Sequence, residues 1–292
     1  MTSFRTDSHV SFIQQTRLNQ SFLLDKHFRL ANNTSNCPKK ELKTMPTPYV
    51  LQGKLAFVMG GGKFGTNALK YLKNNGAKVL IADLNPKCMA KSQADIQTDN
   101  PDIFGSLLNG QSAFLQGNAI DLLLQLLEHK IPDLIVTAIP GNAVAKIVEC
   151  WLSKRNIKLE PNKELLSNVL ENIPSSLVSV ADPETGVIVV SCMPAEKRCR
   201  ENCVPPKTVC ATTGRPKLAP MDKILNFCIY GLADVSTVLV SRQLTGGLGG
   251  IEGKDIVDIL KELDNRIVPY SLAVGTACDC HGVLNLSKTT KS

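Results

Sequence analysis

Three glycines near residue 60 have the spacing of a phosphate-binding loop. Gly60, Gly62 and Gly65 fit the pattern G-x-G-x-x-G, with Lys63 and Phe64 between the second and third glycines. In that pattern the first glycine permits a tight turn, the second lets a pyrophosphate approach the backbone, and the third allows a helix to pack closely on a strand. The phosphates then lie on the unpaired N–H groups of a helix N-terminus. We therefore expect these five residues to contact a dinucleotide; the alternative is a glycine-rich turn that binds nothing.

Three further positions extend this predicted site. Asp83 follows the glycines by about 20 residues, where a carboxylate can accept hydrogen bonds from the adenosine ribose hydroxyls. Such a carboxylate repels a 2′-phosphate, so NAD(H) is favoured over NADP(H). Pro140 and Asn142 lie in the loop after a later strand and are expected to border the cofactor, because ligands bind outside the carboxyl ends of parallel strands. Asn142 could equally be the N-cap of the helix that follows it.

Cysteines concentrate in the last third of the chain, where they could hold a metal. Cys199, Cys203 and Cys210 have the spacing C-x3-C-x6-C in a segment broken by prolines, and Cys280 is the preferred fourth ligand. Thiolates are soft ligands that suit zinc or an iron–sulfur cluster. This spacing matches neither a zinc ribbon nor a ferredoxin, so it predicts a metal centre without choosing the metal.

Other roles for the cysteines remain open at this point. Cys192 and Cys278 are reserve ligands, and His281 is either a ligand or an ordinary hydrogen-bonded histidine. The thiols could instead be redox-active without a metal, or simply small buried side chains. The chain has 10 cysteines and no visible export signal, which predicts a reducing, cytoplasmic compartment.

The sequence around the glycines predicts the elements that position them. Residues 55–59 form a short apolar run typical of a buried strand, and they lead directly into the glycines. Residues 64–72 place apolar side chains on one helical stripe, and Gly76 ends that helix. A second apolar strand, residues 79–82, ends at Asp83.

Strands and helices continue to alternate after this unit, which predicts parallel βαβ connections. The expected fold class is α/β, with a doubly wound, Rossmann-like parallel sheet followed by a Cys-rich C-terminal extension or second α/β lobe. Residues 246–253 are expected to form a glycine-rich loop, able to hold an anion at a helix N-terminus or acting only as a flexible turn. Further helices are expected at 88–96, 119–129, 143–152, 162–173, 221–230 and 254–263. Further strands are expected at 112–115, 134–138, 176–180, 187–191, 235–241 and 270–274.

The domain organisation follows from composition. Residues 1–45 are polar and lack a sustained hydrophobic period, which predicts a disordered extension; a transit peptide, or a true start at Met45, are alternatives. Residues 46–175 are expected to form the dinucleotide-binding domain and residues 176–292 the Cys-rich α/β lobe.

The overall composition excludes several classes of protein. It is 43% hydrophobic and 20% charged, as in ordinary globular proteins. No apolar run approaches the ~20 residues needed to span a bilayer. The formal net charge is +7, but much of the excess lies within residues 1–45, and no basic run with interleaved aromatics predicts nucleic-acid binding.

Residues 51–83 resemble the NAD-binding domain of the siroheme synthase and precorrin-2 dehydrogenase family. The matching sequence segments are Leu51-Gln-Gly-Lys54, the triple glycine and Gly76-Ala-Lys-Val. The TrkA-type NAD-binding domain is a similar match, and either resemblance implies an NAD(P)-binding Rossmann fold. The Cys-rich part is similar to uncharacterised Rossmann proteins of anaerobic microbes, and it departs from both named families, so their activities do not carry over.

Two functions are compatible with these features. The first is an NAD(H)-binding oxidoreductase in which the cysteine-bound zinc or cluster lies near the nicotinamide. The second is a non-catalytic, NAD-responsive regulator with a structural or redox-sensing cysteine site. The partners expected are a small-molecule substrate or a redox partner protein, with no nucleic acid and no membrane span; a homo-oligomer is compatible with either function. No catalytic residue can be named, and a fold alone does not decide between the functions.

Overall fold

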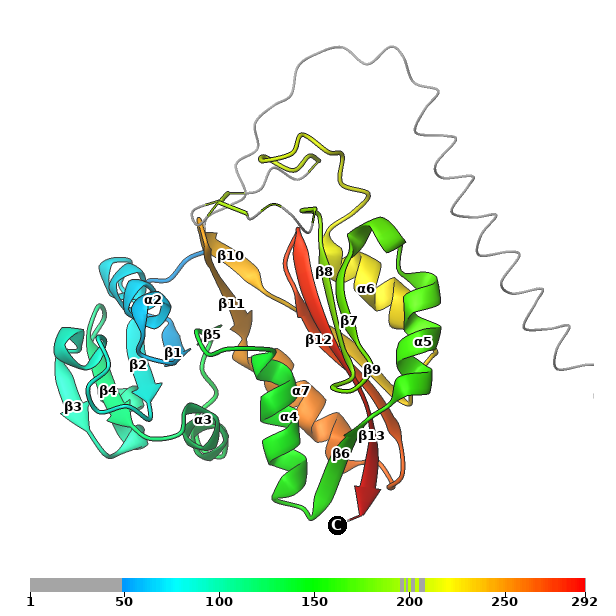
Figure 1. Cartoon of the computed structure of the whole chain (residues 1–292). Coiled ribbons are helices and arrows are strands. Elements are labelled where there is room, and N and C mark those ends of the chain that lie inside the picture. Colours follow the sequence, from blue (N-terminus) through cyan, green and yellow to red (C-terminus); the bar gives the residue numbers. More distant parts are fainter. Residues whose placement is uncertain (1–48, 195–196, 198, 201–202, 205–207, 292) are drawn as a thin grey trace, which may run out of the picture. The chain divides into compact units, whose positions relative to one another are not determined.

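The computed structural model describes residues 49–194, 197, 199–200, 203–204 and 208–291. The predicted extension 1–45 lies outside the described residues. The described chain is a mixed α/β unit built on two mixed sheets, so the expected α/β class is confirmed at that level (Figure 1). A purely parallel sheet is not what forms, because each of the two sheets also contains antiparallel pairs.

Strands and helices follow one another along most of the chain. The strands are β1 Leu55–Met59, β2 Lys78–Asp83, β3 Ile96–Thr98, β4 Ser112–Gln116, β5 Leu134–Thr137, β6 Ile157–Pro161, β7 Val178–Asp182, β8 Val187–Ser191, β9 Val235–Val240, β10 Arg242–Thr245, β11 Leu248–Glu252, β12 Ser271–Ala277 and β13 His281–Lys291. The α-helices are α2 Lys63–Asn74, α3 Ala119–Leu127, α4 Ala143–Ser153, α5 Lys163–Asn172, α6 Met221–Ile229 and α7 Gly253–Asp264. Three 3₁₀ turns are η1 Lys91–Gln93, η2 Pro101–Ser106 and η3 Ser175–Leu177.

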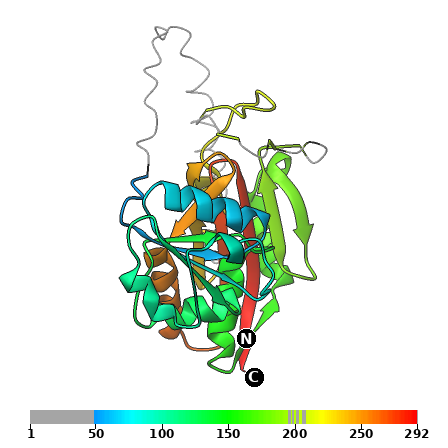
Figure 2. The same ribbon diagram turned by 90° about the vertical axis from the view of Figure 1, so that its left-hand side faces the viewer.

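The first sheet has the order β10-β11-β5-β1-β2-β4-β3. Strands β1, β2, β4, β3 and β5 pair in parallel, whereas β11 pairs antiparallel with β5. The chain therefore moves outward from β1 on one side, returns, and adds β5 on the other side of β1. Helix α2 packs across β1 and β2, as the side view shows (Figure 2).

The second sheet has the order β7-β8-β13-β12-β9, and β6 pairs with the far end of β13. Its long central strand β13 is antiparallel to β8, β12 and β6. The connection from β9 to β12 passes through the β10–β11 hairpin, which belongs to the first sheet, and then through α7. One excursion of the chain thus joins the two sheets.

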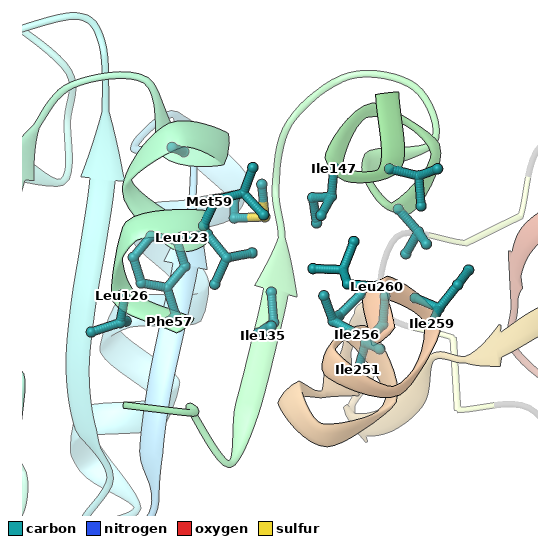
Figure 3. Close-up of a cluster of buried hydrophobic side chains, with 14 of the residues drawn as sticks. Phe57, Met59, Leu123, Leu126, Ile135, Ile147, Ile251, Ile256, Ile259 and Leu260 are labelled. Carbon is teal, nitrogen blue, oxygen red and sulfur yellow. The ribbon is translucent and has the colours of Figure 1, made fainter. Parts of the chain in front are cut away.

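Alternation along β1 divides the core. Phe57 and Met59 face a cluster that continues through α3, α4 and α7 to the second sheet (Figure 3). Ala56 and Val58 face the opposite way and pack against Leu69 of α2. Successive strand side chains point to opposite faces, so a continuous apolar run such as β1 indicates a strand covered on both sides. Helices α5 and α6 cover the other face of the second sheet.

The structure corrects several sequence expectations. Residues 246–253 are not a loop: they form the turn and second strand of the β10–β11 hairpin and the start of α7. The helix expected at 88–96 is only the short turn η1, followed by β3. The strand expected to be last is followed by β13, in which the buried residues Gly282, Leu284 and Leu286 alternate with less buried ones; the apolar Leu284 and Leu286 were a usable signal. Within the described residues, no helix combines the length and apolar character needed to cross a bilayer.

Candidate functional site

The connection between β1 and α2 explains the first and third glycines. Gly60 has φ +98°, and a Cβ there would lie 2.8 Å from the carbonyl oxygen of Ala138. A Cβ on Gly65 would clash with the carbonyl oxygen of Gly60. Both contacts are with backbone, which cannot move aside without separating the helix from the strands. The fold itself therefore requires these two glycines.

Gly62 is different, because nothing in the protein requires it. Gly62 is the N-cap residue of α2 and has an ordinary φ of −71°. As a glycine it has no side chain that could cap the helix. A Cβ there would meet no atom within 4 Å. The first helical hydrogen bond runs from the Thr66 N–H to the Gly62 carbonyl at 2.8 Å. The earlier N–H groups of the helix point beyond its end, where the helix dipole is positive.

Asp83 lies beside this helix terminus, as the sequence spacing predicts. Its carboxylate accepts a 2.5 Å hydrogen bond from the Gly61 N–H and a 2.7 Å hydrogen bond from the Asn85 N–H. A carboxylate has about four acceptor positions, so the two bonds leave further capacity. A Cβ on Gly61 would meet the Cys88 sulfur at 2.5 Å, which means that the segment after Asp83 folds closely over the loop.

A cavity of about 790 Å³ opens next to the start of α2. Its wall includes Lys63 and Phe64, two of the predicted contact residues, and also Pro140. The remaining lining comes from α2, the end of β5 and the residues after it, the β10–β11 hairpin and one residue of the cysteine segment: Asn67, Tyr71, Val136–Ile139, Thr245–Gly249 and Val204. The Tyr71 hydroxyl donates a 2.9 Å hydrogen bond to the Leu244 carbonyl and so fixes α2 to the hairpin.

Asn142 is a buried structural residue in this arrangement. It is only 6% exposed, and its side-chain oxygen Oδ1 accepts a hydrogen bond from the Ala145 N–H at the start of α4. Its amide donates to Asn285 at 3.0 Å and to the Val274 carbonyl at 3.5 Å. The N-cap role, which the sequence left open, is therefore the one with direct contacts, and a cofactor contact stays a prediction.

Cysteines from distant segments meet at one end of the second sheet. The Cys192 N–H donates a 2.9 Å hydrogen bond to the Cys280 carbonyl. Their side chains interact as well, and Lys217 hydrogen-bonds the Cys280 sulfur. The Cys192 thiol, followed by Lys217, lowers the pKa of Cys280 to about 6 although burial opposes the shift. The same contact, together with burial, raises the pKa of Cys192.

The other predicted ligands lie near this pair. Burial, followed by the neighbouring Cys203 thiol, raises the pKa of Cys199. Burial also acts to raise the pKa of Cys210, but hydrogen bonds from Thr213 and the adjacent backbone outweigh it and lower the pKa. The charges of Cys210 and Cys280 also act to raise the pKa of Cys199. The structure therefore brings Cys199, Cys203, Cys210 and Cys280 into one neighbourhood.

A metal centre at these thiols stays a prediction. Within the part of the chain that the structure describes, no three His, Cys, Asp or Glu side chains are arranged to hold a metal ion. Cys278 lies in the β12–β13 turn, with its sulfur 3.8 Å from Nδ1 of His281. Burial, followed by the charge of Lys217, lowers the pKa of His281, so the ring is neutral at pH 7.

Sequence reasoning missed several residues of this region. Asn67 and Tyr71 line the cavity one and two helical turns after Lys63, so their helical spacing from the glycines was a usable signal. The hairpin lining had no such signal, because only tertiary folding brings residues 245–249 next to α2. Lys217 is placed by a small turn in which the Cys210 N–H donates to the Arg215 carbonyl at 2.8 Å.

Comparisons with known proteins correct the resemblance inferred from the glycine loop. Two family models match the chain: an N-terminal domain of uncharacterised proteins over residues 55–140, and the corresponding C-terminal domain over residues 144–290. An uncharacterised protein of Archaeoglobus fulgidus is 31% identical over 231 residues, which cover 79% of this chain and 98% of that protein. The assignment to the siroheme synthase and precorrin-2 dehydrogenase family, or to TrkA-type NAD-binding domains, is therefore wrong. The sequence segments on which it rested are short motifs around the glycine loop. The chain therefore belongs to the AF_1314 family of uncharacterised proteins, whose N-terminal and C-terminal domains it contains.

Proposed function

We propose that the protein binds NAD(H) at the N-terminus of α2 and uses it in an oxidation–reduction reaction. The observation that carries this proposal is the contrast among the three glycines. Gly60 and Gly65 are required by the fold, whereas Gly62 could be any residue as far as the protein's own atoms are concerned. A missing side chain at the exposed end of an uncapped helix suits the close approach of something outside the protein, and phosphates are the ligands that helix N-termini favour.

The neighbourhood of Gly62 supports a dinucleotide rather than a free phosphate. Strands β2 and β5 flank β1 on opposite sides, which makes this the kind of strand-order reversal where nucleotides bind in doubly wound sheets. Asp83 lies on the β2 side, where its carboxylate can accept bonds from ribose hydroxyls and repel a 2′-phosphate. The cavity lies on the β5 side, and its volume of about 790 Å³ falls within the usual range of small-molecule sites.

A redox role is supported by the link between the cavity and the cysteines. Val204, next to Cys203, forms part of the cavity wall. The Gln243 side chain donates a 2.8 Å hydrogen bond to the Cys203 carbonyl, which attaches the cysteine segment to strand β10. A nicotinamide in the cavity would therefore lie toward the thiols. No step is assigned to a metal, because the described thiols are not arranged as a ligand set.

The same link also favours a second candidate, an NAD-responsive regulator. A ligand that orders the hairpin would alter the segment carrying Cys203 and Val204 without any chemistry. The two candidates differ in one measurement, since an oxidoreductase turns over NADH in the presence of an acceptor and a regulator only binds it.

The experiment is calorimetric titration of the full chain with NADH and NADPH, comparing the natural protein with Gly62→Asp. An aspartate at the N-cap can cap α2, so the thermal stability should hold, while its charge should abolish NADH binding. Gly105→Asp is the matched control, because Gly105 is also exposed and also has no atom within 4 Å of its Cβ position. Absence of NADH binding by the natural protein, or equal binding by Gly62→Asp, would refute the proposal.

A further inference from the structure

We infer that Cys192 and Cys280 form a peroxide-reactive dithiol, in which Cys280 is oxidised first and Cys192 then closes an intramolecular disulfide. This assignment stands apart from nucleotide binding. It rests on where β8 and β13 end, and on what surrounds the two sulfurs.

The strand register places the two cysteines directly opposite each other. Strands β8 and β13 are antiparallel, with Gly282 paired to Val190 and His281 paired to Ser191. The next pair in this register is Cys280 with Cys192, and the 2.9 Å hydrogen bond from the Cys192 N–H to the Cys280 carbonyl continues the ladder. Directly opposed residues have Cα atoms about 4.5–5.5 Å apart, and disulfides bridge Cα atoms about 4.4–6.8 Å apart. A bond can therefore form without moving the strands.

The surroundings of the pair assign the roles. Lys217 hydrogen-bonds the Cys280 sulfur and supplies a positive charge, which favours the nucleophilic thiolate there. The Cys192 side chain interacts with the same sulfur and is the nearest source of a resolving thiol. Cys280 is only 7% exposed, so a small hydroperoxide can reach its sulfur more readily than a protein disulfide.

The reaction balances with hydrogen peroxide as the only oxidant. The Cys280 thiolate attacks one peroxide oxygen, the O–O bond breaks, and the hydroxide that leaves takes a proton from solvent to become water. Cys280 is now a sulfenic acid. The Cys192 sulfur attacks the Cys280 sulfur, the S–O bond breaks, and the second oxygen leaves as water with the Cys192 proton. Two thiols have lost two electrons, and one peroxide has become two water molecules.

Other nearby thiols compete with Cys192 and Cys280 for oxidation by peroxide. Cys199 interacts with Cys203, and the Cys210 sulfur lies 3.6 Å from the Met193 sulfur. In the described residues these three thiols lie in irregular segments, where no strand register aligns one with another. Among the described thiols, only Cys192 and Cys280 are held opposite each other by a strand ladder, which runs from this pair along β8 and β13.

The test is peptide mapping of the full chain, reduced without oxygen, treated with one equivalent of hydrogen peroxide and then alkylated. We expect a Cys192–Cys280 disulfide in the natural protein. In Cys192→Ser, dimedone should trap a sulfenic acid at Cys280, and in Cys280→Ser neither product should form. Lys217→Gln should slow the oxidation. Cys150→Ser is the matched control and should behave as the natural protein does, because its sulfur contacts Asp121 far from the pair.

Two results would overturn the assignment. One is a first disulfide between other cysteines, such as Cys199 and Cys203, with Cys280 still reduced. The other is a stoichiometric zinc or iron in the anaerobically purified protein that shields Cys192 and Cys280 from alkylation. Metal analysis of the same sample separates these cases, so a failure here is distinguishable from a failure to bind NADH.

Discussion

The backbone N–H of Gly61 donates a 2.5 Å hydrogen bond to the carboxylate of Asp83, 22 residues later in the chain. This bond joins the ends of β1 and β2, and it holds the glycine loop beside the carboxylate that we predict to bind ribose hydroxyls. One carboxylate therefore fixes the loop and remains available to a ligand.

Asp83→Asn separates the two roles. Gly61 and Asn85 donate to different oxygens of the Asp83 carboxylate, and asparagine has only one oxygen, so one of these two bonds is lost and we expect a cost of about 1 kcal/mol in stability. Loss of the charge should weaken NADH binding by roughly 10- to 100-fold, the range for a hydrogen bond to a charged group. It should also remove the repulsion of a 2′-phosphate, so the preference for NADH over NADPH should shrink. The dissociation constants of both nucleotides check this, and an unchanged ratio would contradict the role given to Asp83.

The glycines make a second, purely structural prediction. Gly65→Ala places a methyl group against the Gly60 carbonyl, so α2 must move away from the sheet. We expect a loss of about 1–3 kcal/mol in the free energy of unfolding, the usual effect of overpacking. Gly62→Ala places its methyl group in open space and should leave stability nearly unchanged. Urea unfolding of both variants is the measurement, and equal destabilisation would show that the glycine loop is not packed as described.

Asn142 provides a third prediction, which decides between its two roles. Asn142→Ala removes the cap of α4 and the bonds to Val274 and Asn285, so we expect a loss of about 2–3 kcal/mol in unfolding free energy. The control is Asn118→Ala, which removes only an exposed cap of α3 and should cost about 1 kcal/mol. If Asn142 is structural alone, the folded variant binds NADH with unchanged affinity. Weakened binding would instead restore the predicted cofactor contact.

Local patterns predicted four strands of the first sheet and also four of the second, namely β7, β8, β9 and β12. The strands that were missed are β3, β10 and β11 in the first sheet and β6 and β13 in the second. Strands β1, β2, β4 and β5 and helices α3, α4 and α6 lie within a few residues of their expected positions, because each is a short apolar run or one apolar helical stripe. The positions of the three glycines and of Asp83 at the ends of these elements were predicted for the same reason. The hairpin 242–252 could not be assigned, because its four glycines are typical of a loop. Gly249 and Gly250 become part of a strand only through pairing with β10, while β5 pairs with the two residues that follow them.

The cysteine region shows a different limit of sequence reasoning. The ligand set Cys199, Cys203, Cys210 and Cys280 stays a prediction: these thiols interact electrostatically, but in the described part of the chain they are not arranged to hold a metal ion. The pairing of Cys280 with Cys192 could not be predicted, because it depends on the antiparallel register of β13, a strand that sequence analysis left out. Family assignment failed for a physical reason too: close packing of a helix on a strand requires glycines at Gly60 and Gly65, and unrelated families can share such a turn.

The last prediction concerns the dependence of stability on pH. Asp133 precedes β5, and its carboxylate accepts hydrogen bonds from the Lys54 ammonium at 2.9 Å and from the Leu55 N–H at 2.8 Å. Burial acts to raise the pKa of Asp133, but these bonds outweigh it and lower the pKa. A group with a lowered folded pKa stabilises the protein above its unfolded pKa of about 3.9, and this contribution disappears as the pH falls through the folded pKa.

Asp133→Asn should therefore destabilise the protein near pH 6 and have progressively less effect below pH 4. The side chains are partly exposed, so the charge interaction should contribute no more than about 1 kcal/mol. Urea unfolding from pH 6 to pH 2.5 measures this, and the double variant with Lys54→Met is the control, because the two substitutions should not add. An effect of Asp133→Asn that stays constant across this range would mean that the interaction at the start of β1 does not depend on the carboxylate charge.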